Sequence, residues 1–582
     1  MERGRIKSDL IYSLILNAAA LIVSVLLYCP FFEENDDAFI AMISEGAFGS
    51  RDHHLIYANV VYGKILTALS SLFSGVRWHS VLQYLLIFAA MTLMTLFICR
   101  YSGSRLFALL FTAASFYELY VSLQYSKTAA FAASVGFVLL FRQVHEKEKD
   151  TAGIISGSVL LTAAALLRDS SFYLAGIFAF VICMTDLAGT VFSSGKRDDK
   201  KAGPGAFSDR FLSYVRVFAP VLTIILVLVS VNRWSYEKDE GWKTFTEYND
   251  NRMRLLDYRY DLLDITKHKD SLSKAGISEN DALLYLTWQF GDDGILSSEK
   301  MEGILETGTM RPVDLSMFKG FAANVYNDFF RLNPLCLFLL FVIVVLISGD
   351  FVKRRGLVPA IFVLCLELFV FCGILFYFHY SGRWTHRVAY GAALSLCVML
   401  TGLYVSGCFG EKTVKIKDPD GPDNTKLLIP VLVFLAFADI SLLLGNRFDH
   451  NAYKREEPDY KAFYGYVADN ADTLFVADTF TFQNAYVYDI FTAYPEGFLK
   501  NYVTTGSWFV NSPITKEITG RFGYKNPFDA LCGDDENVIL ADNLYPEEKL
   551  EFINEHYGED HYLSEQGEIN GIRLYGIHKK PE

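Results

Sequence analysis

Long apolar runs alternate with short polar connections along most of this chain. The runs measure about 15–22 residues, close to the ~20 that an α-helix needs to cross a hydrocarbon core ~30 Å thick. They predict eleven spans, near residues 10–28, 80–99, 106–122, 128–141, 153–167, 171–190, 214–231, 335–349, 357–378, 388–407 and 427–445. The pattern therefore predicts an α-helical polytopic membrane protein.

The connections between these spans alternate in charge. If the N-terminus is cytoplasmic, every connection on that side is short and rich in Lys and Arg, as the positive-inside rule requires. The basic clusters are Arg3/Arg5/Lys7, Arg100/Arg105, Arg142/Lys147/Lys149, Lys196/Arg197/Lys200/Lys201, Lys353/Arg354/Arg355 and Lys412/Lys415/Lys417. We therefore expect a multi-pass cell-membrane protein with a cytoplasmic N-terminus and an extracytoplasmic C-terminal domain.

The spans divide the chain into four regions. Residues 1–231 form an N-terminal transmembrane region that includes a first outer loop, 29–79. Residues 232–333 are expected to form a mostly helical extracytoplasmic insertion, and residues 334–445 contain the C-terminal transmembrane helices. Residues 446–582 form the fourth region, which is predicted to be an extracytoplasmic α/β domain.

The α/β prediction depends on local patterns in the last region. Short apolar runs at 473–477 and 537–541 are typical of buried strands, and 547–556 is typical of a helix. Asn570-Gly571 lies between two further strand-like stretches and predicts a tight hairpin.

Composition excludes several classes of function. The chain of 582 residues is 52% hydrophobic and has a net charge of -13, without a long basic block to neutralise nucleic-acid phosphates. Most of its cysteines lie in or beside apolar runs, which argues against a disulfide framework or a CxxC metal site. There is no Walker A motif, no dinucleotide-binding glycine motif and no GxSxG elbow.

The first outer loop carries the richest chemistry. It begins with Glu33-Glu34-Asn35-Asp36-Asp37, directly after the first span. Carboxylates at this position act as a base, bind a metal or stay solvated; we expect Glu33 and Glu34 to be solvated. His53 and His54 follow, and Leu55–Phe73, which contains Asn59, predicts an amphipathic helix at the membrane interface. Adjacent histidines suit one zinc ion poorly.

Three arginines lie on the predicted outer side, where positive-inside statistics disfavour them. Arg168 ends an apolar run, and either pairs with Asp169 or meets a lipid phosphate. Arg383 and Arg387 are four residues apart, so a helical segment would present both on one face to a phosphate.

Three acids lie within the apolar runs: Glu367, Glu118 and Asp439. Burying such groups is costly, so each is a candidate for function. For Glu367 we favour hydrogen bonding between helices in its protonated form.

These positions resemble those of the GT-C superfamily of multi-pass membrane glycosyltransferases. Asp36-Asp37 resembles its acidic motif after the first span. Leu166-Leu167-Arg168-Asp169 resembles the basic residue at an outer helix end, and Arg383/Arg387 resembles its late phosphate-binding positions. The resemblance extends to the overall plan of spans, outer loops and C-terminal outer domain.

The resemblance implies transfer of a sugar from a polyprenyl-phosphate donor to a saccharide or other envelope acceptor at the outer membrane face, with inversion. It implies that Asp37, or Asp36, is the catalytic base and that Arg168, Arg383 and Arg387 bind the donor phosphate, with His53, His54 and Asn59 in supporting roles. No cofactor is required, although a divalent cation (Mg or Mn) is compatible with the carboxylates.

Two other functions stay open. A transporter or flippase for a lipid-linked saccharide is motivated by Glu367, Asp439 and the many spans, although the chain shows no repeated halves. The other is a non-catalytic membrane scaffold related to glycosyltransferases, whose outer domains bind partners.

Overall fold

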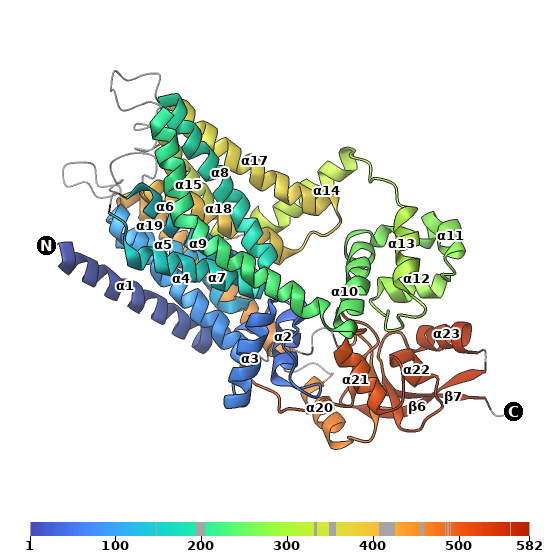
Figure 1. Ribbon diagram of the computed structural model, residues 1–582. Helices are drawn as coiled ribbons and strands as arrows, with labels where there is room; N and C mark the ends of the chain where they lie inside the picture. Colours follow the sequence, from blue (N-terminus) through green and yellow to red (C-terminus); the bar gives the residue numbers. More distant parts are fainter. Residues whose placement is uncertain are drawn as a thin grey trace.

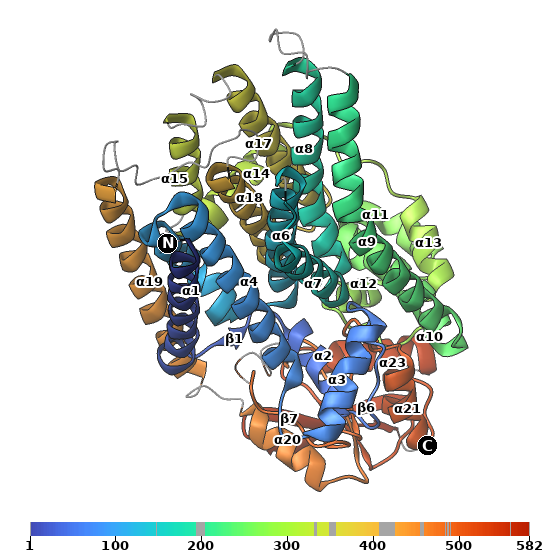
Figure 2. The same ribbon diagram turned by 60° about the vertical axis from the view of Figure 1, so that its left-hand side comes forward.

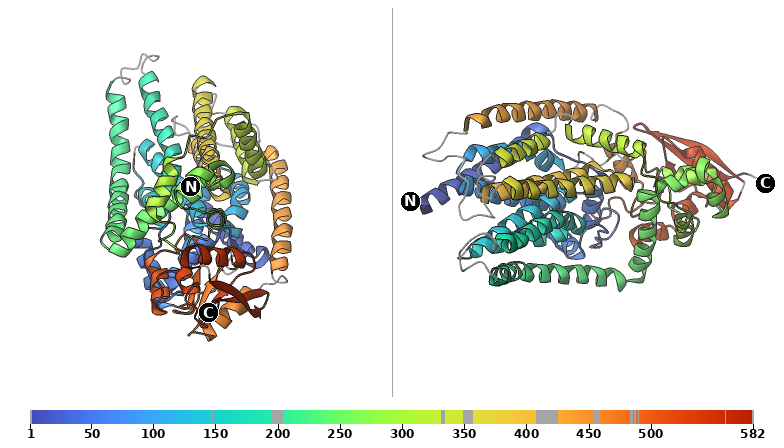
Figure 3. Two further views of the ribbon diagram at one scale, coloured as in Figure 1. Left: turned by 90° about the vertical axis from the view of Figure 1, so that its right-hand side faces the viewer. Right: turned by 90° about the horizontal axis from the view of Figure 1, so that it is seen from above.

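The computed structural model describes residues 2–146, 148–193, 204–330, 334–348, 357–406, 425–453, 459–482, 485, 488, 490–558 and 560–580. The long helices run side by side as one bundle, and most of the shorter helices and the β-sheet gather at one end of it (Figure 1). The N-terminus lies at the other end of the bundle (Figure 3). This arrangement confirms the prediction of a helical polytopic membrane protein with a C-terminal α/β domain.

Within these ranges, 8 helices are long and apolar enough to cross a membrane. They are α1 (Glu2–Val23, extended by a π-turn, Ser24–Tyr28), α4 (Trp78–Ser102), α6 (Tyr125–His145), α8 (Asp169–Ser193), α9 (Pro204–Glu237), α17 (Leu357–Tyr380), α18 (His386–Ser406) and α19 (Thr425–Tyr453).

The other three predicted spans are also helical but shorter. α14 (Leu315–Val325) and α15 (Pro334–Ser348) are long and apolar enough to cross a membrane only when taken together, as a pair bent by 96°. α5 (Arg105–Phe116) passes into a π-turn, and α7 (Thr151–Leu167) stops where Arg168 adopts an extended conformation. The apolar runs therefore located a helix in every case but overestimated how many reach full membrane thickness.

α6 is the central helix of the bundle, and 89% of its apolar 18-residue stretch is buried. It packs against α7 at two glycines: a Cβ added to Gly136 would lie 2.9 Å from the Gly157 carbonyl oxygen, and one added to Gly157 would lie 2.9 Å from Leu140. Small residues that let backbones approach closely are typical of helix packing in membranes. This close packing fixes the position of Arg168 at the end of α7.

The first outer loop forms α2 (Asn35–Glu45) and α3 (Val60–Leu72). A two-residue strand, β1 (Phe31–Phe32), pairs in parallel with β2 (Ser122–Leu123), which brings the acidic cluster against the outer end of α5. α3 is capped by Asn59, whose side-chain oxygen accepts from the Val61 amide at 2.9 Å. Its outward-facing residues Ile65 and Leu72 are exposed, as expected of an interfacial helix.

The segment that follows α9 is mostly helical. It contains α10 (Glu240–Arg252), a π-helix η3 (Met253–Tyr258), a 3₁₀ turn η4 (Tyr260–Leu263), α11 (Ile265–Lys274), α12 (Glu279–Leu286), α13 (Ser298–Glu306), α14 and η5 (Tyr326–Phe330). α10 runs at an angle to α9 from the end of that helix (Figure 1).

The C-terminal domain is a five-stranded mixed sheet of order β4-β3-β5-β7-β6. Strands β3 (Leu474–Ala477), β4 (Tyr502–Thr504) and β5 (Val538–Ala541) are parallel, and β6 (His561–Ile569) and β7 (Ile572–Lys579) form an antiparallel hairpin. Its helices are α20 (Tyr460–Asp469), α21 (Pro513–Arg521), α22 (Pro527–Leu531) and α23 (Pro546–Tyr557).

The predicted hairpin is confirmed. Its turn residues Asn570 and Gly571 both have positive φ, 49° and 83°, as a type I′ turn requires.

The segments predicted to lie outside the membrane meet at one end of the bundle. Figure 2 shows α2 and α3 beside the C-terminal domain. The Gly497 amide donates to the Gly46 carbonyl at 2.8 Å, and the Leu499 amide donates to the Ala47 carbonyl at 2.7 Å. First loop and C-terminal domain therefore form one outer assembly, whose extracytoplasmic side stays a prediction from loop charge.

Candidate functional site

A cavity of about 820 Å³ lies where the bundle meets the outer assembly. One part of its wall is apolar and comes from α8 and α17, including Leu174, Ile177, Val370 and Ile374. The other part is polar and comes from the connections at the outer helix ends. A lipid with a charged headgroup has the same division into an apolar and a polar part.

The three predicted arginines line this one cavity. Arg168 follows α7 directly, Arg383 lies between α17 and α18, and Arg387 is in the first turn of α18. We call these three residues the cavity arginines. Segments more than 200 positions apart in the chain thus place three cations around one space.

Two cavity arginines are neutralised by carboxylates. Arg383 pairs with Asp257 of η3 and stacks on the Tyr258 ring, 5.0 Å from its centroid. Arg387 reaches Glu34 at 2.9 Å and Asp36 at 3.4 Å. Burial raises the pKa of Glu34, and the Arg387 charge opposes that rise.

Arg168 has a different environment. Its Nη1 donates to the Tyr57 carbonyl at 3.0 Å, and its guanidinium lies 4.9 Å and 5.4 Å from the ring centroids of Tyr57 and Tyr125. It forms no ion pair with a carboxylate in the described part of the chain, and the neighbouring Asp169 instead accepts from the Ser170 amide at 2.6 Å. Arg168 is therefore the cavity arginine whose charge is free to attract an anion.

The two aspartates of α2 differ in environment. Asp36 is next to the cavity through Arg387 and retains 8% exposure. Asp37 is fully buried, and its Oδ1 accepts from His79 Nε2 at 3.0 Å, Gln83 Nε2 at 2.8 Å and the Tyr125 amide at 3.1 Å. Burial raises the pKa of Asp37, while the hydrogen bond from His79 counteracts the rise. Asp37 is thus enclosed, and Asp36 is the aspartate beside the cavity.

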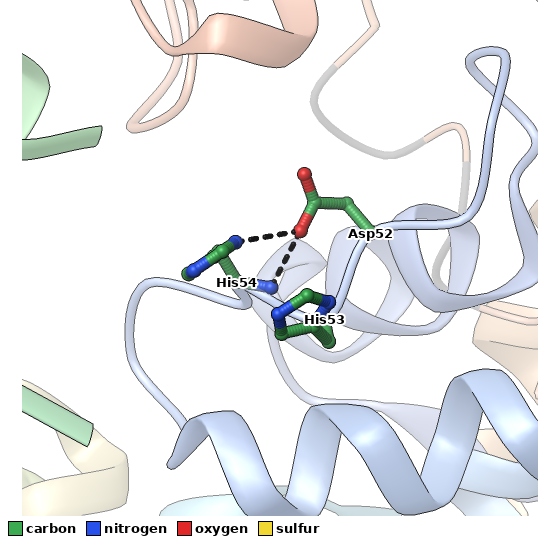
Figure 4. Close-up of side chains that lie close together, drawn as sticks. All are labelled: Asp52, His53 and His54. Atoms are coloured by element: carbon green, nitrogen blue, oxygen red, sulfur yellow. Dashed lines mark hydrogen bonds and ion pairs between the residues drawn. The ribbon is translucent and has the colours of Figure 1, made fainter. Parts of the chain in front are cut away.

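His53 and His54 belong to the first loop, beside Asp52 (Figure 4), and neither is part of the cavity wall. Asp52 Oδ1 accepts from the His54 backbone at 2.7 Å and contacts its Nδ1 at 2.9 Å, while His54 Nε2 contacts Ser235 Oγ at 3.1 Å. Both ring nitrogens of His54 therefore have hydrogen-bond partners, and its side chain links the first loop to α9. Burial lowers the pKa of His53, whose ring lies 4.3 Å from that of His54. Asn59 does line the cavity.

Asp52, His53 and His54 are close enough together to be considered as metal ligands. Because both His54 nitrogens already have partners, the group fits a cation poorly. A divalent cation stays a prediction without an assigned site.

Sequence reasoning missed a buried charge network beside the cavity. Lys127 is fully buried, with its Nζ 2.5 Å from Glu33 and 2.7 Å from Glu118. His386 adjoins Glu118 at 3.7 Å. The expectation that Glu33 is solvated was therefore wrong, because it pairs with Lys127 of a distant helix, which the local sequence does not reveal. Glu34 pairs with Arg387, but 40% of its side chain is exposed, so it is partly solvated.

Glu367 is fully buried in α17, and neither of its carboxyl oxygens has a hydrogen-bond partner among the described residues. The expected bond between helices is therefore not formed there. Asp439 is half-buried in α19, and its backbone carbonyl accepts from the Tyr28 hydroxyl at 3.0 Å.

Neither a protein-family model nor a curated protein sequence matches this chain. Among solved structures, it is similar to ArnT from Cupriavidus metallidurans bound to undecaprenyl phosphate, with 11% identity, a TM-score of 0.36, and coverage of 96% of this chain and 97% of that one. Since so distant a likeness supports no argument about activity, the residues of this chain must carry that argument.

Proposed function

We propose that this protein is a membrane glycosyltransferase that moves a sugar from a polyprenyl-phosphate donor to an acceptor at the outer membrane face, with inversion. The observation that supports it best is the cavity, which joins an apolar wall from two spanning helices to three arginines. Arg168, without a carboxylate partner in the described structure, is the first anchor for the donor phosphate.

The donor phosphate is also the leaving group. As the bond between the anomeric carbon and the phosphate oxygen breaks, negative charge grows on that oxygen, and fixed cations nearby lower the barrier. Arginine presents planar, bidentate donors that suit phosphate. The prenyl chain extends along the apolar wall between α8 and α17, which holds the headgroup at the cavity arginines.

The acceptor hydroxyl attacks the anomeric carbon from the face opposite the phosphate, which inverts the configuration. Its proton passes to a carboxylate, and polyprenyl phosphate departs. A general base must come within ~3 Å of the hydroxyl. Asp36 contacts Arg387 of the cavity wall, whereas Asp37 is enclosed, so we assign the base to Asp36 and the orientation of the α2 N-terminus to Asp37.

Arg387 links the two halves of the reaction. Without donor it neutralises Glu34 and Asp36. A donor phosphate competes for the same guanidinium, and each contact transferred to phosphate leaves Asp36 more basic. Donor binding thereby prepares the base for the acceptor.

The test is transfer of labelled sugar from a panel of undecaprenyl-phosphate-linked sugars to envelope acceptors in membranes. Wild type should transfer at least one sugar, while Asp36→Asn should abolish transfer. The control is Asp270→Asn, which removes an exposed carboxylate on α11. Full activity in Asp36→Asn and in the Asp36→Asn/Asp37→Asn double variant would refute the base assignment.

A lipid-linked saccharide transporter is the second candidate, because Glu367 is a buried membrane carboxyl without a partner in the described structure. It predicts that Glu367→Gln blocks translocation in reconstituted vesicles. Normal translocation in that variant would remove this motivation, and sugar transfer without any translocation would favour the transferase.

A further inference from the structure

Arg252, the last residue of α10, is 1% exposed. Its Nη2 donates to the Tyr57 hydroxyl at 2.9 Å, and its Nη1 lies 3.3 Å from Asp257 Oδ1. Asn249 Oδ1 accepts from its Nε and Nη2 at 3.0 and 2.8 Å. Arg252 is not part of the cavity wall, so it is placed to act on other residues and not on a ligand.

Two residues that bond to Arg252, Tyr57 and Asp257, each also contact one cavity arginine. The Tyr57 carbonyl accepts from Arg168, and the Tyr57 ring supports its guanidinium. The second oxygen of Asp257 pairs with Arg383. One buried cation therefore connects the supports of both arginines, although neither arginine touches it.

The aromatic rings of Trp288 and Phe290 lie against Arg252, with centroids 5.4 and 5.8 Å from its Cζ. Such contacts stabilise a desolvated guanidinium by cation–π attraction. The segment Trp288–Gly291 belongs to the insertion but is attached to the C-terminal domain. Gln289 Nε2 donates to Asp478 Oδ1 at 2.5 Å, and the Gly291 amide donates to the Thr505 carbonyl at 2.8 Å.

This attachment is made at the carboxyl ends of β3 and β4. In α/β sheets, that edge is where ligands generally bind. Here the insertion occupies it so closely that a Cβ added to Gly506 would lie 1.4 Å from the Trp288 carbonyl oxygen. Trp288 itself has a φ of 62°, which is unusual for a residue other than glycine and indicates that its contacts hold it.

We propose that Arg252 is a positioning residue for the cavity arginines, and that the C-terminal domain acts on the cavity by holding Arg252 through the segment Trp288–Gly291. Its consequence for catalysis rests on the proposed function, whereas its consequence for the geometry of Arg168 and Arg383 does not. The domain contributes order to the cavity, and none of its described residues is part of the cavity wall.

The test measures the reactivity of individual arginines with phenylglyoxal in the purified full-length protein, read by mass spectrometry. Arg252→Gln should raise the labelling rates of both Arg168 and Arg383 about fivefold or more, a typical size for coupling between sites. Arg254→Gln removes an exposed arginine two residues away and should leave both rates unchanged. Equal rates in wild type and Arg252→Gln would overturn the proposal, whether or not the protein transfers sugar.

Two further variants separate positioning from general loss of structure. Asp257→Asn is nearly isosteric and should raise labelling of Arg383 but not of Arg168. Gly506→Ala, in the C-terminal domain, should displace Trp288 and raise both rates. If Arg252→Gln does not fold, Arg252→Lys replaces it, because an ammonium group cannot contact Tyr57 and Asp257 as a planar guanidinium does. Unchanged labelling in both Asp257→Asn and Gly506→Ala would equally overturn the proposal.

If donor transfer is established, the same variants give a kinetic readout. Arg252→Gln should raise KM for the donor more than it lowers kcat, with partial rescue in Arg252→Lys. A fall in protein stability with unchanged donor KM would assign Arg252 a purely structural role.

Discussion

Two charged clusters in this protein differ in how their cations are paired. In the C-terminal domain, Lys549 lies fully buried between Asp478 at 2.8 Å and Asp542 at 2.6 Å. Both carboxylates also accept hydrogen bonds from backbone amides. At the cavity, by contrast, Arg168 has an aromatic and carbonyl environment and no carboxylate partner among the described residues.

The contrast distinguishes a structural cluster from a binding cluster. Where every charge has a partner and every side chain is fully buried, the cluster joins elements of the fold, here β3, β5 and α23. Where a cation faces a cavity without a counter-charge, we propose that an anion completes the arrangement. A buried charge alone therefore says little about function until its partners and the surrounding space are known.

The largest expected effect comes from breaking the structural cluster. Lys549→Met leaves two buried carboxylates unpaired, and removal of one partner of a buried ion pair typically costs about 3–5 kcal/mol. Chemical unfolding of the outer assembly, monitored by limited proteolysis, should show that loss of stability. Lys516→Met breaks the exposed pair with Asp293 and should change stability little. Equal stability of the two variants would contradict the structural role.

The binding cluster should respond in the opposite way. Arg168→Gln should reduce sugar transfer roughly 100-fold or more, the usual cost of losing one group that stabilises transition-state charge, with little change in stability. Arg233→Gln, an exposed arginine on α9, is the control. If Arg168→Gln destabilises the protein as much as Lys549→Met does, the distinction between the clusters fails.

A pH dependence should appear at the joint between the insertion and the C-terminal domain. The hydrogen bond to Asp281, at 2.8 Å, raises the pKa of His556 above its ordinary value. The stabilisation is complete below the ordinary histidine pKa of about 6.5 and is lost as pH rises through the higher folded-state value. Unfolding stability should fall over this range in wild type and not in His556→Gln. A parallel fall in both would exclude His556 as the source.

The smallest effect is expected from removing divalent cations. The proposed reaction uses arginines and a carboxylate, so chelation with EDTA should leave the transfer rate unchanged. A loss of transfer that Mg or Mn restores would show that the carboxylates near the cavity bind a cation.

The sequence predicted what local chemistry determines. Hydrophobic run length located the helices, and Asn570-Gly571 located the hairpin because a type I′ turn needs positive φ at both positions. The cavity arginines were identifiable because arginine is unusual on the predicted outer side. Their convergence in one cavity depended on packing, which no local pattern encodes.

The residues that sequence reasoning missed act through long-range partners. Nothing in the local sequence around Lys127, Asp257 or Arg252 distinguishes them from solvated residues of an outer loop. Each becomes significant only because a distant segment supplies its partner: Glu33 for Lys127, Arg383 for Asp257 and Tyr57 for Arg252. The different roles of Asp36 and Asp37 also depended on burial. Two adjacent aspartates look the same in the sequence, so it could not predict which of them is enclosed.

The central claim is that the cavity binds a polyprenyl phosphate through Arg168. The direct measurement is binding of undecaprenyl phosphate, and of undecaprenol as the uncharged control, to the purified protein and to Arg168→Gln. We predict tight binding of undecaprenyl phosphate to wild type, at least about tenfold weaker binding to Arg168→Gln, as expected for a charge-assisted contact, and weak binding of undecaprenol to both. Equal affinities of wild type for the two lipids, or unchanged phosphate-lipid affinity in Arg168→Gln, would contradict it.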